Sequence, residues 1–511
     1  MSLFRYPWFP YVFALGLPLT LYSHNQAAFA TGDVLRPTLV FLLTAAALVA
    51  VFRQVVANRV LADTLAVVPL IGLWLLGLGW QLYLTLSLLV LGSFMVRHRQ
   101  LPDTSVPVLN ALAFGVLFLP VFMIIQVEAI TRDDSLQSIS YSPFSAPSTT
   151  LMGDHRPDIY HIVLDAYGGS YALAEELGFD NSEFYRELRN LDFMVNESII
   201  VPYNETVHTM SAIFLGDYLR ADEFPIDSDS PSRLRSTLGT LIVNGPVQDI
   251  LRDNGYSILY TDPGHHFLRF PDDAFILGPQ NDVLLNRFEL HLGAVTGLDR
   301  YLPSLYEVTL EDPLIRSVED AFDNDFDEFE SPKFAYQHVL APHTPFTIDR
   351  TGATLESAIF KDTGEGDRVV LDDPVRREAY VAGYLEKLRF VNDRVVEQVR
   401  RLRALPGEKI IVVHGDHGSG SQFYSDDSDR TCLRERFTSF LAVYADDPEI
   451  RNEFRWISEP GATPVNLYRS MFNVLLDLDL DMLPNKSSFV GYSTPNKLQP
   501  LDSDRIPLAC N

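Results

Sequence analysis

Apolar residues form two different patterns along the chain, with long runs before about residue 130 and short runs after it. Helices of about 17–25 mostly apolar residues cross a bilayer, so the long runs predict five membrane-spanning helices, several near the lower length limit. They lie at about Trp8 to Leu21, Val34 to Phe52, Leu61 to Leu78, Leu82 to Val96 and Val106 to Ile125. The alternative for the first run is a cleaved signal peptide, but no clean cleavage site follows it.

The arginines between these runs predict how the helices are oriented. Basic residues concentrate on the cytoplasmic side of membrane proteins, and five arginines fall on one side of the expected spans. These five are Arg5, Arg53, Arg59, Arg97 and Arg99, whereas Arg36 and Arg132 fall on the other side. The pattern therefore predicts a cytoplasmic N-terminus and an odd number of crossings, which delivers the rest of the chain outside the cytoplasm.

The short runs after residue 157 alternate between strand and helix patterns. Strands are expected at 158–164, 193–201, 256–261, 333–340, 410–413 and 437–444, and helices near 206–215, 246–254, 376–402 and 463–478, with 282–328 mostly helical. Strands that alternate with helices predict an α/β domain with a mostly parallel sheet covered by helices on both faces. The expected organisation is a transmembrane region at 1–130, a Ser- and Pro-rich linker at 131–156 and a catalytic domain at 157–511.

Net charge narrows the range of partners. The whole chain has 40 Lys and Arg and 67 Asp and Glu, of which seven and six precede residue 151, so 33 basic and 61 acidic residues follow. The part after the membrane region thus has a formal charge of −28. Such a surface repels nucleic acid at long range, and binding to DNA or RNA is not expected.

Acidic and histidine side chains follow two of the expected strands. Asp416 and His417 come directly after the run Ile410 to Val413, and Asp165 follows the strand 158–164. Ligands bind at the carboxyl ends of strands in open α/β sheets, and Asp and His are donors for divalent cations. The alternative is that these residues belong to ordinary Asp-Gly turns with exposed histidines.

Two further residues have positions that suit chemistry. Thr206 stands at the expected start of a helix, where free backbone N–H groups and the helix dipole favour a bound phosphate or sulfate. A plain N-cap role is the alternative for this threonine. His343 lies between two prolines at the end of the strand 333–340, a setting that packing in a core explains poorly.

Six segments in order resemble the sulfatase-like branch of the alkaline phosphatase superfamily. They read VLDAYGGS (163–170), NETVHTMSAIFLGDYL (204–219), HVLAPHTPF (338–346), GYLEKLRFVNDRVVEQV (383–399), VVHGDHGSG (412–420) and ERFTSFLAVY (435–444). Membrane helices followed by such a domain resemble bacterial phosphoethanolamine transferases and lipoteichoic acid synthases. The resemblance covers roughly residues 157 to 478 and implies an alkaline phosphatase-like fold.

The resemblance also implies roles for individual residues. By it, Thr206 is the catalytic nucleophile, and one divalent cation (Mn, Mg or Zn) is bound by Asp165, Thr206, Asp416 and His417. His343 matches a substrate-binding histidine. No histidine follows His417, although the transferases usually have one, and Arg434 or Arg436 is the expected replacement in anion binding, with a plain surface arginine as the alternative. Neither cysteine lies in a Cys-x-Pro-x-Arg motif, so sulfate-ester hydrolysis through formylglycine is not expected.

The expected function is metal-dependent transfer of a phosphoryl-linked headgroup from a membrane lipid donor to an envelope glycan or lipid acceptor. Phosphatidylglycerol and phosphatidylethanolamine are examples of such donors. A phosphodiesterase or other sulfuric or phosphoric ester hydrolase that uses the same residues is the alternative enzyme. A catalytically silent membrane scaffold is the alternative of a different class.

Cysteine count adds one expectation about covalent structure. The chain has two cysteines, Cys432 and Cys510, and both lie in the part expected outside the reducing cytoplasm. An even count in such a compartment predicts a disulfide between them, with two free thiols as the alternative.

Overall fold

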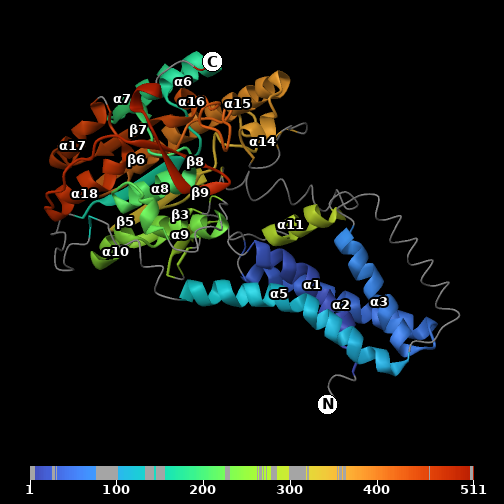
Figure 1. Cartoon of the computed structure of the whole chain (residues 1–511). Helices are drawn as coiled ribbons and strands as arrows, with labels where there is room; N and C mark the ends of the chain where they lie inside the picture. Colours follow the sequence, from blue (N-terminus) through green and yellow to red (C-terminus); the bar gives the residue numbers. More distant parts are fainter. Residues whose placement is uncertain are drawn as a thin grey trace. The chain divides into compact units, whose positions relative to one another are not determined.

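The computed structural model places the chain in two compact units, each described by itself. Unit 1 comprises residues 1–136 and 282–312, and unit 2 comprises residues 137–281 and 313–511. The structure describes residues 6–25, 29, 31–75, 102–132, 143–144, 156–224, 231–261, 263, 267–268, 270–271, 273–277, 285–298, 318, 321–353, 355, 360, 364–459, 461–506 and 510. Figure 1 shows the elements of both units in sequence colours.

Unit 1 is all helical in its described residues. Its helices are α1 (Phe9–His24), α2 (Thr31–Val55), α3 (Arg59–Leu75), α5 (Val106–Arg132) and α11 (Arg287–Thr296), with a short turn η3 (Asp103–Ser105). Two stretches among the described residues, Thr31–Val55 and Asp103–Gln126, are long and apolar enough to cross a membrane. The prediction of five spans is therefore corrected to two candidate spans among the described residues. The expected span at 82–96 lies outside the described residues, and α1 has 16 residues, which at about 1.5 Å per residue is short for a bilayer core.

Buried polar contacts join the helices of unit 1. Arg53 at the end of α2 donates from Nε to Asp63 of α3 at 2.6 Å. The amide of Asn110 on α5 accepts from the backbone N–H of Phe9 at 2.9 Å, and its Nδ2 donates to the carbonyl of Tyr6. These contacts fix neighbouring helices against one another, because an unpaired polar group among apolar side chains is costly.

Unit 2 is built on a seven-stranded sheet whose spatial order is β2-β7-β6-β1-β5-β3-β4. The strands are β1 (Asp158–Leu164), β2 (Met194–Ile200), β3 (Ser257–Thr261), β4 (Phe275–Leu277), β5 (Lys333–Val339), β6 (Lys409–Gly415) and β7 (Thr438–Ala445). β1 pairs in parallel with both β5 and β6, and β7 runs antiparallel to its neighbours β6 and β2. The mostly parallel sheet expected from the sequence is thus confirmed, and its central strands are buried along their whole length, as parallel strands are.

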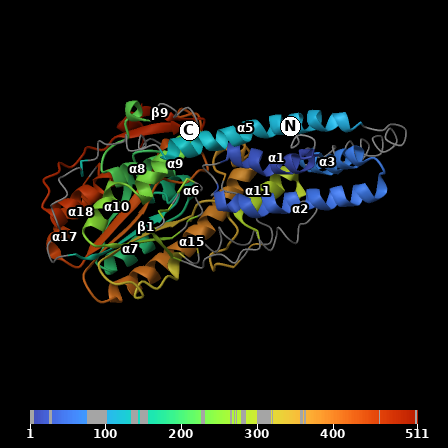
Figure 2. The same cartoon turned by 90° about the horizontal axis from the view of Figure 1, so that it is seen from below.

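Helices cover both faces of this sheet (Figure 2). Side chains of α8 (Thr206–Leu215), α9 (Pro231–Val243), α10 (Pro246–Asp253) and α18 (Leu467–Leu476) form one core with Ile159 and Val163 of β1. Those of α6 (Ser170–Leu177), α7 (Ser182–Asn190) and α15 (Pro374–Ala404) form the other core with Tyr160 and Ile162. Successive residues of one strand therefore serve opposite cores, as the period of two requires.

The remaining elements are shorter. They are η5 (Ala221–Glu223), α14 (Asp367–Val370), α16 (Leu433–Phe437), α17 (Pro448–Glu453), η7 (Phe454–Ser458), η8 (Pro464–Asn466), the hairpin of β8 (Ser487–Gly491) and β9 (Thr494–Leu501), and η9 (Ser503–Arg505). The hairpin was not predicted from the sequence. The segment 282–312 was expected in the catalytic domain, whereas its described residues, 285–298, group with unit 1. The predicted disulfide is confirmed, since Cys432 and Cys510 are bonded.

Candidate metal and nucleophile site

Asp165 occupies the turn at the carboxyl end of the central strand β1. Its carboxylate is fully buried, and its backbone N–H donates to the carbonyl of Val339 on the neighbouring β5. The next residue, Ala166, has φ +63°, a left-handed conformation that is uncommon outside glycine. Such a backbone is held in place only where its surroundings determine it, and here the N–H of Ala166 donates to Asp416, which follows β6.

Asp416 and His417 follow the adjacent strand β6 and are also buried. Oδ1 of Asp416 accepts from the backbone N–H groups of Ala166, at 3.0 Å, and of His417, at 2.8 Å. Nδ1 of His417 lies 2.9 Å from the carbonyl oxygen of Gly418. Donation of that N–H to the carbonyl leaves the lone pair of Nε2 available, which is the tautomer a metal-bound histidine needs.

The three side chains converge on one point. His417 Nε2 lies 3.7 Å from Asp165 Oδ1 and 3.5 Å from Asp416 Oδ2, and one ligand atom from each residue lies within 4.8 Å of the others. Asp416 Oδ2 is buried and accepts no hydrogen bond from the described residues. Two buried carboxylates beside a histidine repel each other unless a cation joins them, so these residues fit a divalent metal ion. We call Asp165, Asp416 and His417 the metal cluster.

Thr206 is the first residue of α8 and stands next to the metal cluster. Its hydroxyl Oγ1 lies 3.1 Å from His417 Nε2, and the side chain is partly exposed. The helix begins after Glu205 without a side-chain cap, so Thr206 does not serve as the capping residue. The other hydroxyls of α8 face away from the cluster, because Thr209 donates to the carbonyl of Tyr203 and Ser211 to that of Leu238.

His343 lies in the loop after β5, next to Asp165. Its backbone N–H donates to the carbonyl of Asp165 at 3.1 Å. The buried ammonium of Lys387, from α15, donates to three carbonyls of this loop, including that of His343 at 2.8 Å. Burial lowers the pKa of Lys387 to about 7. Lys387 thus holds the backbone of the loop, while the side chain of His343 stays directed at Glu365.

Glu365 links His343 to a second cation, Arg436. Its Oε2 lies 3.4 Å from His343 Nε2 and accepts from Arg436 Nη1 at 2.8 Å. Burial alone lowers the pKa of His343, but the carboxylates of Glu365 and Asp165 outweigh it and raise the pKa to about 9. Burial alone raises the pKa of Glu365, and the charges of Arg436 and His343 hold it well below its usual range. His343 is therefore a cation at neutral pH.

Arg436 is the arginine that reaches the metal cluster. Its Nη2 lies 3.3 Å from His417 Nε2, its Nη1 donates to the carbonyl of Gly418 and its Nε to that of Asn204. A Cβ on Gly418 would lie 2.9 Å from the carbonyl oxygen of Thr438. Only glycine therefore lets the loop after His417 approach the backbone of Thr438 so closely. Arg436 therefore connects the loop before Thr206 with the loop after His417.

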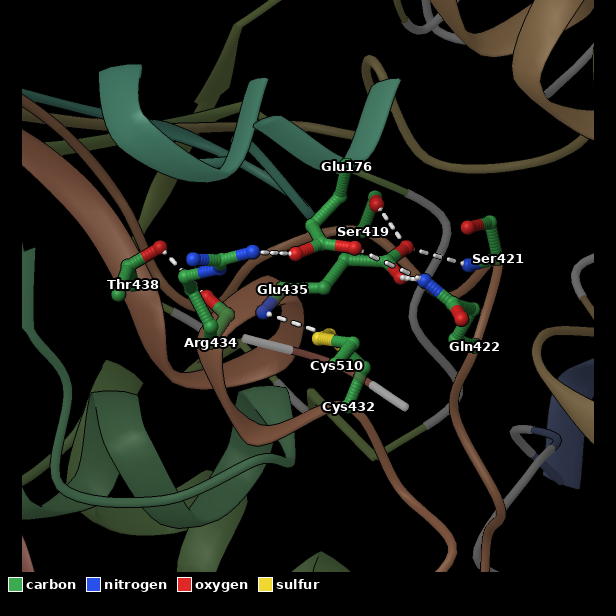
Figure 3. The surroundings of a disulfide bond; sticks show 9 residues. All are labelled: Glu176, Ser419, Ser421, Gln422, Cys432, Arg434, Glu435, Thr438 and Cys510. Atoms are coloured by element: carbon green, nitrogen blue, oxygen red, sulfur yellow. Dashed lines mark hydrogen bonds and ion pairs between the residues drawn. A yellow bond between two sulfur atoms is a disulfide. The ribbon is translucent and has the colours of Figure 1, made fainter. Parts of the chain in front are cut away.

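Arg434, the alternative from the sequence analysis, points elsewhere (Figure 3). Its guanidinium pairs with Glu176 of α6 beside the Cys432–Cys510 disulfide. On the same short helix, the carboxylate of Glu435 accepts from the hydroxyl of Ser419 and from the backbone N–H of Ser421 at 2.7 Å. The contacts of Glu435 anchor α16 to the loop that follows the metal cluster, and the disulfide ties Cys510 to the residue before this helix. Arg434 thus stabilises the fold next to the site and is not part of the metal cluster.

The structure brings together six of the seven residues singled out from the sequence, all but Arg434, and adds three that sequence reasoning missed. Glu365 and Lys387 had no local signal, because one lies in a loop and the other within a regular helix. His338 was not singled out because it lies within the expected strand, but its Nε2 lies 3.4 Å from Asp165 Oδ2. Its place at the end of β5, next to β1, was the available signal.

Comparisons with known proteins were made at the levels of sequence and structure. No protein-family model and no curated protein sequence matches the chain. Three solved structures that resemble it are the integral membrane protein lipooligosaccharide phosphoethanolamine transferase A from Neisseria meningitidis, the periplasmic domain of phosphoethanolamine transferase EptC from Campylobacter jejuni and the phosphonate monoester hydrolase of Agrobacterium radiobacter.

These similarities are distant. The Neisseria match has 12% identity and a TM-score of 0.38, and it covers 89% of this chain and 76% of that one. The Campylobacter and Agrobacterium matches both have 11% identity and a TM-score of 0.37. They cover 63% and 65% of this chain, and 91% and 80% of the respective structures. At such values, function has to be argued from the site itself.

Proposed function

We propose that this protein is a metal-dependent enzyme that transfers a phosphoryl-linked headgroup from a membrane lipid to a glycan or lipid acceptor, with Thr206 as nucleophile. The observation that supports it best is the position of the Thr206 hydroxyl, partly exposed at a helix start and 3.1 Å from His417 in a buried cluster with two carboxylates. A hydroxyl beside such a cluster is arranged for attack on an ester centre.

The reaction proceeds in two displacements. The oxygen of Thr206 forms a bond to the donor's phosphorus, the bond from phosphorus to the lipid alcohol breaks, and the proton of the threonine ends on that alcohol. The acceptor hydroxyl then attacks the same phosphorus, the bond from phosphorus to Thr206 Oγ1 breaks, and the acceptor's proton passes to that oxygen, which restores the free threonine. The headgroup's ester energy is conserved in the covalent enzyme, so the transfer needs no nucleotide.

A divalent cation (Mn, Mg or Zn) held by Asp165, Thr206, Asp416 and His417 would lower the pKa of the threonine hydroxyl and offset phosphoryl charge. The ligand set supplies three oxygen donors and one nitrogen, which suits Mn²⁺ or Zn²⁺ better than Ca²⁺. The residues themselves orient the nucleophile, because α8 fixes Thr206 and the Gly418 carbonyl fixes the ring of His417.

His343 and Arg436 supply fixed positive charge for the phosphoryl oxygens. Both are buried, and Glu365 holds them as a pair next to the metal cluster. Preorganised cations of this kind stabilise the charge that develops in phosphoryl transfer without having to reorganise during the reaction. In this arrangement Arg436 takes the role that the sequence analysis assigned to either arginine.

The membrane region gives the proposed donor its location. We propose that it crosses the cytoplasmic membrane from an N-terminus in the cytoplasm, as the arginine pattern predicts, and that unit 2 lies outside the cytoplasm. Two of the described stretches have the length and apolarity to cross. The disulfide in unit 2 agrees with a compartment outside the reducing cytoplasm.

Trapping the covalent intermediate tests this proposal. Full-length protein in detergent is incubated with a headgroup-labelled phospholipid, and the adduct is located by peptide mass spectrometry. Label is expected on Thr206. Thr206→Ala should keep its metal and lose turnover by several orders of magnitude, whereas Thr206→Ser should retain part of it. Thr209→Val is the matched control, because Thr209 bonds to a backbone carbonyl within unit 2.

The products separate the proposal from its alternatives. Label on a glycan or lipid acceptor supports a transferase, whereas release of the headgroup to water from an equally labelled Thr206 supports the hydrolase. An active Thr206→Ala protein, or label on another residue, contradicts the nucleophile. A purified protein that binds no divalent metal and takes up no label would instead be a scaffold.

A further inference from the structure

Helix α11 belongs by sequence to the part of the chain after the membrane region, yet it is packed within unit 1. The segment 282–312 is preceded and followed by stretches of unit 2, at 137–281 and 313–511. The chain therefore passes between the two units three times along its sequence. With a single passage, only the segment before β1 would connect them.

An ion pair with two hydrogen bonds joins α11 to the start of α2. Arg36 donates from Nε to Glu289 Oε1 at 2.6 Å and from Nη2 to Glu289 Oε2. Glu289 is 9% exposed, so one face of this pair is shielded from water. A bidentate Arg–carboxylate pair is the strong and directional form of such a contact.

Asn286 completes the polar attachment. It precedes α11 and exchanges hydrogen bonds with Glu289, since each residue's backbone N–H donates to the other's side chain at 2.9 Å. Its Nδ2 donates to the carbonyl of Asp33 on α2, also at 2.9 Å. The same acid thus caps α11 and binds Arg36, so the helix start and its docking depend on each other.

Apolar side chains on one face of α11 also pack against the other helices of unit 1. Phe288 is fully buried in a cluster with Tyr22 and Val34, and its ring packs edge-on against that of Phe29. Leu292, one turn later, is buried in a cluster with residues of α1, α2 and α3. Residues four apart lie on the same helical face, so α11 presents a continuous apolar stripe to the membrane helices.

We propose that α11 is a docking helix that ties the catalytic unit to the membrane helices and makes the enzyme specific for esters presented at the membrane surface. This inference rests on the proposed function. A flexible linker lets a domain explore a volume that grows with its length, whereas a second attachment raises the effective concentration of the site at that surface. Esters that diffuse freely in solution gain nothing from the attachment.

A charge exchange across the Arg36–Glu289 pair tests the docking helix. The full-length variants Arg36→Glu and Glu289→Arg, and the double variant that carries both changes, are compared with the wild type in detergent-free vesicles. Two substrates are used, a headgroup-labelled phosphatidylethanolamine in the same vesicles and soluble bis(p-nitrophenyl) phosphate. Arg53→Glu is the matched control, because it breaks a pair between α2 and α3 that does not involve α11.

Each single exchange is expected to lower turnover of the vesicle lipid about tenfold or more, as the loss of an attachment lowers effective concentration. Turnover of the soluble diester should not change, and the double variant should recover the lipid activity. Arg53→Glu should show no such selective loss. Equal losses on both substrates, or unchanged lipid turnover in both single variants, would overturn the inference.

Hydrogen exchange keeps this result separate from that of the proposed function. Peptides spanning 285–298 should be protected in the wild type, less protected in each single variant and protected again in the double variant. If the wild type turns over neither substrate, the proposed function fails. In that case, equal protection of 285–298 in all variants refutes the docking. Protection that falls in the single variants and returns in the double variant supports the docking alone.

Discussion

Two buried clusters of charged residues lie in unit 2, and their carboxylates have different surroundings. In the metal cluster, Asp416 Oδ2 is buried and accepts no hydrogen bond from the described residues. In the cluster beside the disulfide, Glu176 pairs with Arg434 (Figure 3). There Glu435 accepts hydrogen bonds from two serines and from Gln422.

The difference indicates what each cluster is for. A buried carboxylate whose two oxygens both have donors contributes to the stability of the fold, whereas one with an oxygen that lacks a donor destabilises it until a ligand supplies the missing charge. Proteins retain such a cost mainly at sites of function. The comparison therefore predicts a structural role for the disulfide cluster and ligand binding by the metal cluster, and matched changes in the two clusters test both.

The largest effect is expected from removing one negative charge from the metal cluster. Asp416→Asn should lose the bound metal and several orders of magnitude in turnover, while the metal-free protein keeps or gains thermal stability, because two buried carboxylates no longer repel each other. Metal content by mass spectrometry and thermal unfolding without metal check both parts.

Glu435→Gln is the matched control for this change. The same acid-to-amide change should keep the metal and cost about 1–3 kcal/mol of stability, because it weakens satisfied hydrogen bonds. A metal-binding Asp416→Asn, or a Glu435→Gln without metal, would reverse the assignment of the two clusters.

The next effect concerns the disulfide. Replacing both cysteines, as Cys432→Ser with Cys510→Ser, opens a loop with a sequence separation of 78 residues. The chain-entropy relation gives a loss of about 4–5 kcal/mol for such a loop. Thermal unfolding of the full-length protein with and without the cysteines measures it, and metal content at low temperature should stay normal. An unchanged unfolding temperature would show that the tail contributes nothing to unit 2.

The smallest effect is expected at Glu365. Glu365→Gln should lower kcat/KM about 10- to 150-fold, mostly through KM, because a charged hydrogen bond contributes roughly 1.5–3 kcal/mol. The raised pKa of His343 means that its charge is present at neutral pH and is lost as the pH rises through about 9. Activity should fall above that pH.

In Glu365→Gln the fall should begin at lower pH, since burial then lowers the pKa of His343 with less opposition. The pH profile of kcat/KM for the wild type and the variant measures this. An identical alkaline limb in both proteins would show that Glu365 does not control the charge of His343.

The sequence by itself determined the elements that present the chemistry. β1 and α8 have the bounds expected from the pattern, because a buried parallel strand is a short apolar run and a helix begins where the periodicity changes. Alternation of strand and helix also placed Asp165, Asp416 and His343 at one edge of the sheet. Cysteine count was enough for the disulfide, because two cysteines allow one pairing.

Only the tertiary structure decided which side chains meet at long range. Arg434 and Arg436 are two positions apart, and the choice between them depends on Glu176 and Glu365, which come from other elements. The hairpin of β8 and β9 was missed because its prolines and polar residues weaken the strand pattern. Alternating apolar and polar residues reveal a strand only where one of its faces is apolar and the other is polar.

The placement of α11 shows the same limit most clearly. An amphipathic helix indicates that one of its faces will be covered, but the pattern does not say by what. Arg36 stood out only as an exception to the charge bias of the membrane loops, and its partner Glu289 follows 253 residues later. Local patterns encode secondary structure because neighbours in sequence are neighbours in space, whereas a contact over such a separation is decided by how the whole chain packs.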